Sequence, residues 1–184
     1  MPSIVLGRRL LRVLLFLLGP APAGAAVEIS FYSREWGERF PHAFVRITGS
    51  VDATGETVDA NFGFTAKRVS PAVLMGAVEG EVIAVDAKYV ARSDRHFSLK
   101  LSDQEYRSVL ALIDGYRTLP QPSYHLNRRN CVFFVADVAA ALGLEASPVR
   151  KLMKKPRSFL QKVKADNLVL LARRGAAGLQ ASRR

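Results

Sequence analysis

Alternating apolar and polar positions predict a series of β-strands in the first half of the chain. Residues 43–48 (AFVRIT) and 57–65 (TVDANFGFT) are rich in apolar, aromatic and β-branched side chains, and a loop with two glycines separates them. We therefore expect residues 42–65 to form a long antiparallel hairpin. Three more segments of similar character are expected to be strands, namely residues 27–32, 80–86 and 95–101.

The second half of the chain has the signals of helices. Ser102 and Glu105 have the spacing of a capping box, and the helix that they open carries one apolar stripe. A second long helix is expected from Cys131 to about residue 142, with Asn130 as its N-cap. Two short basic helices should follow residue 147. The fold class that this order predicts is α+β, a small antiparallel sheet of about four to five strands packed against the helix that begins at Cys131.

The N-terminus has the pattern of a secretory signal peptide, residues 1–25. Arginines precede a short apolar run at residues 13–18, and small residues at Ala23 and Ala25 fit a cleavage site. The apolar run is far shorter than the roughly 20 residues that span a bilayer, and Gly19-Pro20 ends it. We therefore expect cleavage near Ala25 and a periplasmic or secreted mature protein.

The positive charge is concentrated in the last part of the chain. The chain has a formal net charge of +11, and residues 150–184 hold eleven Lys or Arg and one acid. This contrast divides the mature chain into a nearly neutral domain, residues 26–147, and a basic C-terminal helical extension, residues 148–184. Residues 150–184 are a candidate for contact with a membrane surface or an acidic wall polymer, unless their apolar residues pack on the domain and their charges only face solvent. Because the chain is expected to be exported, no nucleic-acid partner is expected.

A single cysteine limits the possible chemistry. It excludes an intramolecular disulfide, and three well-separated histidines give no metal-binding pattern, so neither a metal nor another cofactor is expected. Cys131 is expected in the first turn of its helix, where unpaired N–H groups and the helix dipole favour the thiolate. The alternative is an inert thiol buried in the core.

A cysteine nucleophile needs a base, and the base needs a group that orients it. His42 begins a predicted strand, and a sheet can bring it to the start of the Cys131 helix. Asp59 and Asn61 lie two residues apart on the partner strand and so share a face. Asn61 is the first choice of orienting residue, because it is expected nearer the start of the His42 strand. His96 and His125 compete with His42 for the role of base.

Residues 124–135 (YHLNRRNCVFFV) resemble the Y-x-L-x-x-x-N-C-x-x-F-V element of lecithin:retinol-acyltransferase-like proteins. These are circularly permuted relatives of the NlpC-type cell-wall cysteine peptidases, within the papain-like group. The order is also similar, since His42-Ala43-Phe44-Val45 precedes Asn130-Cys131 as the histidine strand does in permuted members. The resemblance implies a permuted papain-like fold, with Cys131 as nucleophile, His42 as base and a polar residue on the next strand as orienter.

Two departures limit the resemblance. The acyltransferases have Glu-His after the cysteine, where this chain has Val132-Phe133, and their second histidine falls at Thr54. The acyltransferase substrate is therefore not carried over. The sequence predicts an exported cysteine hydrolase (an amidase or peptidase, or an acyltransferase) that acts on a peptide or acyl substrate, with peptidoglycan stem peptides first and a lipid ester second. The alternative is a catalytically silent papain-like binding module whose basic tail contacts a membrane or an acidic wall polymer.

Overall fold

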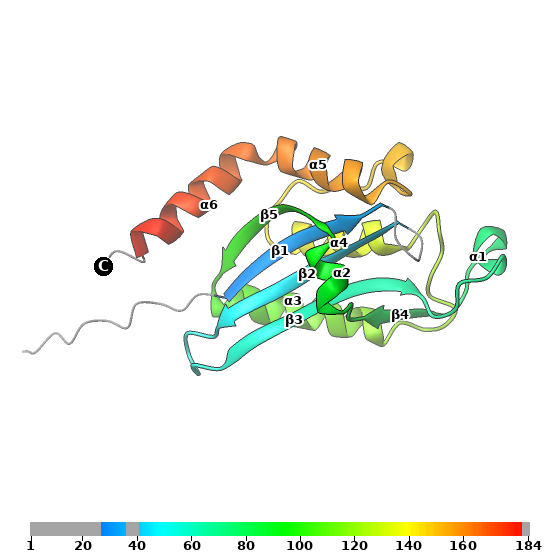
Figure 1. The fold of residues 1–184 in the computed structure, drawn as a ribbon, viewed down its shortest axis with the longest axis horizontal. Coiled ribbons are helices and arrows are strands. Elements are labelled where there is room, and N and C mark those ends of the chain that lie inside the picture. Colours follow the sequence, from blue (N-terminus) through cyan, green and yellow to red (C-terminus); the bar gives the residue numbers. More distant parts are fainter. Residues whose placement is uncertain (1–26, 36–40, 182–184) are drawn as a thin grey trace, which may run out of the picture.

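The computed structural model describes residues 27–35 and 41–181, and it confirms an α+β architecture with a five-stranded antiparallel sheet. Helix α2 crosses one face of the sheet, while α3 and α4 lie behind the other (Figure 1). The expected signal peptide, residues 1–25, lies outside the described residues. In the part of the chain that the structure describes, no helix is both long and apolar enough to cross a membrane.

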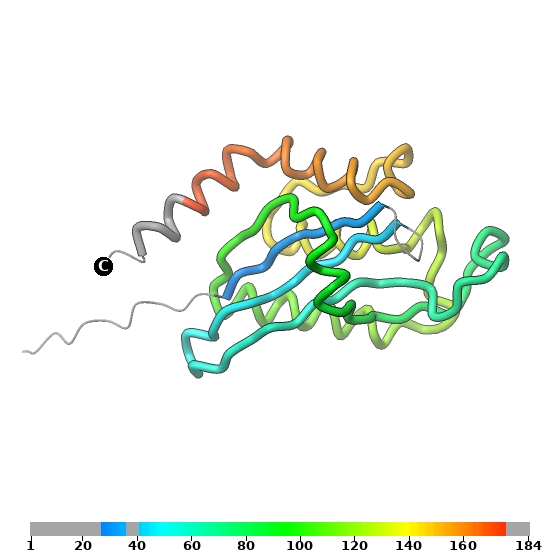
Figure 2. Tube along the Cα trace, in the orientation of Figure 1, coloured from blue at the N-terminus to red at the C-terminus, as the bar shows by residue number. Residues whose placement is uncertain are grey.

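The sheet has the strand order β4-β3-β2-β1-β5, and every neighbouring pair is antiparallel. Each strand expected from the sequence is present, although the strand expected at residues 80–86 ends at Ile83. Strand β1 lies beside both β2 and the much later β5 (Figure 2). The strands are β1 (Val27–Arg34), β2 (His42–Ser50), β3 (Thr57–Ala66), β4 (Gly80–Ile83) and β5 (Asp94–Leu101).

The two longest helices predicted from the sequence begin where their caps indicate. Ser102 and Glu105 form the expected capping box of α3, and the Asn130 side chain caps α4. Helix α2 has no counterpart in the prediction, because a single short turn leaves almost no periodic signal. The helices are α1 (Ala72–Met75), α2 (Ala87–Ala91), α3 (Asp103–Arg117), α4 (Cys131–Ala141), the 3-10 turn η1 (Arg150–Leu152), α5 (Pro156–Asp166) and α6 (Leu168–Ala181).

One hydrophobic core joins the sheet to α3, α4 and α5. Helix α4 contributes most of its residues to this core, and Phe159, Leu160 and Val163 of α5 are almost completely buried in it. The boundary expected at residue 148 therefore does not separate two cores. The basic extension is helical, and its first α-helix packs on β1 and β5 as an integral part of the domain.

The β2–β3 ladder fixes where candidate site residues lie along the hairpin. Its pairs run from Ser50↔Thr57 to Val45↔Phe62, while both strands continue beyond that last pair. His42 and Ala43, at the start of β2, therefore lie just beyond the end of the ladder. This is the end of the sheet to which α4 brings its N-terminus.

Candidate active site

Local and tertiary hydrogen bonds hold the N-terminus of α4 in place. The Asn130 side-chain oxygen accepts hydrogen bonds from the backbone N–H groups of Val132 (2.8 Å) and Phe133 (3.4 Å). Its amide nitrogen donates to the carbonyl oxygens of Leu126 (2.7 Å) and Met153 (2.8 Å). Since Asn130 is buried and all these bonds converge on it, it fixes the position of the next residue in the chain, Cys131.

The Cys131 sulfur is buried and faces backbone N–H groups. Burial raises the pKa of the thiol, whereas hydrogen bonds from the N–H groups of Ala43, Cys131 and Val132 lower it. Burial has the larger effect, and the pKa rises to about 11. The expectation that the helix start favours the thiolate is therefore wrong for the resting protein, because loss of hydration outweighs the helix-terminal N–H groups.

The contact with Ala43 brings the nucleophile candidate to the predicted histidine strand. The N–H group that Ala43 directs at the sulfur belongs to the peptide bond between His42 and Ala43. Residues that are 89 positions apart in the sequence thus meet at the start of β2 through a backbone group, whereas the sequence predicts that the His42 imidazole itself lies against the start of the helix. The structure brings together Cys131 and the backbone of His42.

The His42 imidazole is buried on the side of β2 that faces α2. Its ring stacks along Phe44 with a centroid distance of 6.2 Å, and Phe44 in turn contacts Tyr89 of α2. The ring lies over Gly63, where an added Cβ would collide with Nε2 and lie 2.9 Å from Cε1. The imidazole and the sulfur therefore approach the start of β2 from the α2 side and the α4 side, respectively.

Asn61 and Asp59 do not lie beside His42. The ladder pairs Asn61 with Arg46 and Asp59 with Thr48, four and six residues along β2 from His42. At roughly 3.3 Å per residue, this places Asn61 about 13 Å along the strand. The placement of Asn61 opposite the start of β2 is therefore wrong.

Both candidate orienting residues also have other partners. The Asn61 amide donates to the Val85 carbonyl oxygen (2.9 Å) and accepts from the Val85 N–H (2.7 Å). Both Asp59 carboxylate oxygens accept from the Arg46 guanidinium at 3.0 Å, and these hydrogen bonds lower the pKa of Asp59. Asn61 thus fixes the segment before α2, while Asp59 belongs to an exposed ion pair.

The other two histidines make contacts of their own. His96 Nε2 lies 2.8 Å from Ser33 Oγ, and burial lowers the pKa of its imidazole. His125 Nδ1 accepts a hydrogen bond from the Asn127 N–H at 3.1 Å. Of the three histidines, His42 is the one whose backbone borders Cys131.

Two residues near the site were not predicted from the sequence. Tyr124 is buried, and the pKa of its phenol is raised first by burial and then by the charge of a Cys131 thiolate, so the two groups are close. Gly63 leaves room for the His42 ring. The available signals were the place of Tyr124 in the motif that contains Cys131 and, for Gly63, a glycine inside a predicted strand, which can mark a close approach of another group.

The described residues contain no group of three or more His, Cys, Asp or Glu side chains placed to hold a metal ion. No family model, curated protein or solved structure matches the chain.

Proposed function

We propose that the protein is an exported cysteine hydrolase with a permuted papain-like fold, in which Cys131 is the nucleophile and His42 the base. The observation that carries this proposal is the contact between the Cys131 sulfur and the peptide N–H that joins His42 to Ala43. A thiol at the capped start of a helix, beside the first residues of a histidine-bearing strand, is the arrangement that the papain-like resemblance implies.

The high pKa of Cys131 decides when its proton leaves. With a pKa of about 11, the resting site holds a thiol at neutral pH. In the proposed mechanism the His42 imidazole, which rests on the α2 side of β2, turns past the start of the strand toward the sulfur. It accepts the thiol proton as general base in the step in which the sulfur attacks the carbonyl carbon of the substrate. Backbone N–H groups at the start of α4 stabilise the oxyanion of the tetrahedral intermediate.

The remaining steps return the enzyme to its starting state. The protonated imidazole gives its proton to the leaving amine, and the C–N bond breaks to leave a thioester on Cys131. Water then attacks the thioester carbonyl and gives a proton to the imidazole, which passes it to the departing sulfur. For an exported protein, the amides of peptidoglycan stem peptides are the substrate class that we propose, and a lipid ester is the second.

The burial of Cys131 favours a second candidate function. The residue is 7% exposed, and its sulfur is held by backbone groups, as in a thiol that only packs. A catalytically silent papain-like binding module would retain this geometry without turnover.

Turnover of stem peptides tests the proposal. The chain lacking residues 1–25 is incubated with muropeptides, and amide cleavage is followed by mass spectrometry. We expect Cys131→Ala to abolish cleavage and His42→Gln to lower kcat by roughly 10²–10⁴-fold, because the general base is lost. Gly63→Ala, whose Cβ would displace the imidazole, should also lower kcat.

Asp59→Asn is the matched control, since Asp59 is exposed and remote from His42 along the hairpin. It should retain full activity. Cleavage that survives Cys131→Ala would contradict the proposed mechanism. A folded protein that cleaves neither muropeptides nor simple esters would favour the silent module.

A further inference from the structure

Helix α1 exposes large apolar side chains at one end of the molecule. Leu74 is 74% and Met75 89% exposed, and the nearby Val69 is 57% exposed. Helix α1 lies at the end of the domain opposite α6 (Figure 1). Several exposed apolar side chains on one projecting turn are typical of a surface that contacts another apolar phase.

The same helix forms one wall of a strongly basic cavity. The cavity has a volume of about 830 Å³, and its lining contains Leu74 and Met75 but no acidic residue. The lining also includes five exposed cationic side chains. Among the described residues, no carboxylate lies within 4.0 Å of these side chains, so their charges are available to an external anion. They are Arg128, Arg150, Lys151, Lys154 and Lys155.

Hydrogen bonds tie both the α1 side and the basic side of this cavity to the segment that precedes α4. Val78, just after α1, exchanges two backbone hydrogen bonds with Tyr124 (2.9 and 3.0 Å). On the basic wall, the Met153 carbonyl oxygen accepts from the Asn130 side chain at 2.8 Å. The apolar turn and the cationic wall therefore hold a defined position relative to each other.

We propose that this cavity and α1 together dock the protein on an anionic lipid bilayer. The phosphate groups of the lipids would lie against the cationic wall, and Leu74 and Met75 would enter the interfacial region. The positive charge selects an anionic surface. The exposed apolar turn favours a bilayer over a soluble polyanion, since a soluble polyanion offers it no apolar phase.

Co-sedimentation with vesicles tests this proposal. The chain lacking residues 1–25 is mixed with vesicles of equal parts phosphatidylglycerol and phosphatidylcholine, or of phosphatidylcholine alone. We expect the protein to bind the anionic vesicles, and we expect this binding to weaken as the salt concentration rises. The double variant Lys151→Gln/Lys154→Gln should lower the partition coefficient by roughly tenfold or more. Leu74→Ser/Met75→Ser should also lower it by roughly tenfold or more, and both side chains are too exposed for this change to unfold the protein.

Lys88→Gln/Arg92→Gln is the matched control, because it removes the same charge from exposed positions in and just after α2. It should bind like the parent protein, and so should Cys131→Ala, which separates docking from the proposed hydrolase activity. If Lys88→Gln/Arg92→Gln lowered the partition coefficient as much as Lys151→Gln/Lys154→Gln does, the proposal would be overturned, because net charge alone would then explain binding. Binding that depends on Lys151 and Lys154 but not on Leu74 and Met75 would instead identify a site for a soluble polyanion.

Discussion

At the scale of single residues, burial and hydrogen bonding have opposite effects on the Cys131 thiol. Burial raises its pKa, and the three N–H groups around the sulfur recover only part of the cost of losing water. These backbone N–H groups thus stabilise a negative charge at this position, but not enough to ionise the thiol in the resting protein. In the proposed mechanism, an oxyanion on the substrate would use the N–H group of Cys131.

The pH dependence of alkylation checks this balance. At neutral pH, a thiol with a pKa of about 11 has about one hundredth of the thiolate of a thiol with the ordinary pKa of 9.0. The thiolate fraction rises about tenfold for each pH unit below the pKa, so labelling by iodoacetamide should accelerate steadily up to about pH 11. The rate is measured by intact mass on the folded chain.

The same chain in denaturant provides the reference, because its exposed thiol should titrate at the ordinary pKa. Limited access to the buried sulfur would lower the labelling rate at every pH but would not move the midpoint. Rapid labelling in mild acid by the folded protein would show that a thiolate–imidazolium pair already exists at rest. In that case, the proton would leave before the substrate is attacked, contrary to the proposed order of steps.

At the scale of elements, the start of α4 depends on one amide side chain. Asn130→Ala removes the cap and leaves the partly buried carbonyl oxygens of Leu126 and Met153 without this donor. We expect the free energy of unfolding to fall by about 2–4 kcal/mol. Loss of the cap should contribute roughly 1 kcal/mol of this, and the unsatisfied carbonyl oxygens the rest. Urea unfolding followed by circular dichroism measures this loss.

Asn127→Ala is the control in the same loop, since the Asn127 side chain is exposed. Its effect should stay within about 0.5 kcal/mol. Asn130→Asp should keep the cap but lose both donated bonds, so it should remain well below the parent in stability. If Asn130→Asp were as stable as the parent protein, this would contradict the role of the two carbonyl contacts.

The elements that the sequence predicted well are those with local signals. The capping box at Ser102 and the cap at Asn130 are each encoded within four residues, and both helices begin where expected. The start of β2 at His42 was also predicted, because an apolar and β-branched run follows it. These signals were sufficient to place a cysteine and a histidine at the ends of elements that can meet.

The register of the hairpin could not be predicted in the same way. Asp59 and Asn61 share a face of β3, as the alternation indicates, but their partners on β2 depend on the loop from Val51 to Glu56. A polar residue near a candidate base looks the same in sequence whether it orients an imidazole or, like Asn61, holds a neighbouring segment. The burial that sets the thiol pKa likewise depends on distant parts of the fold.

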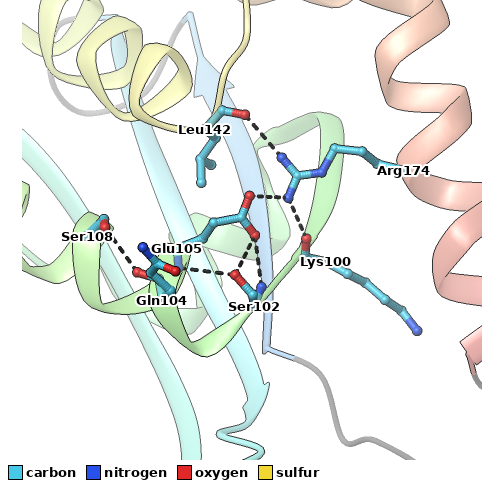
Figure 3. Close-up of polar contacts among 7 residues, drawn as sticks. All are labelled: Lys100, Ser102, Gln104, Glu105, Ser108, Leu142 and Arg174. Carbon is cyan, nitrogen blue, oxygen red and sulfur yellow. Dashed lines mark hydrogen bonds and ion pairs between the residues drawn. The ribbon is translucent and has the colours of Figure 1, made fainter.

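At the scale of the whole molecule, one arginine connects α6 to the rest of the domain. Arg174 donates to the carbonyl oxygens of Leu142 (3.1 Å) and Lys100 (2.9 Å) and to the Glu105 carboxylate (2.8 Å; Figure 3). These partners lie at the end of α4, in β5 and in the first turn of α3. Glu105 also accepts from the Ser102 backbone and hydroxyl, so the capping box of α3 and the attachment of α6 share one carboxylate.

Removal of this arginine should weaken both the attachment of α6 and the overall stability. We expect Arg174→Ala to cost about 1–2 kcal/mol of unfolding free energy, less than a fully buried charged network because Glu105 is partly exposed. Arg173→Ala removes the same charge from an exposed neighbour on α6 and should have little effect. Urea unfolding and hydrogen exchange of the α6 amides measure the two consequences.

Acid should narrow the difference in stability between the parent and Arg174→Ala. Partial burial raises the pKa of Glu105, but hydrogen bonds from Ser102 and the Arg174 charge outweigh it and lower the pKa below the ordinary 4.5. A carboxylate with a lowered pKa in the folded state stabilises it above the unfolded pKa, and this stabilisation is lost as the pH falls through the folded pKa. The stability gap should therefore be complete at pH 7 and shrink as the pH falls below about 4.5. A gap that does not change with pH would show that Arg174 acts through the two carbonyl oxygens alone and that Glu105 contributes nothing to holding α6.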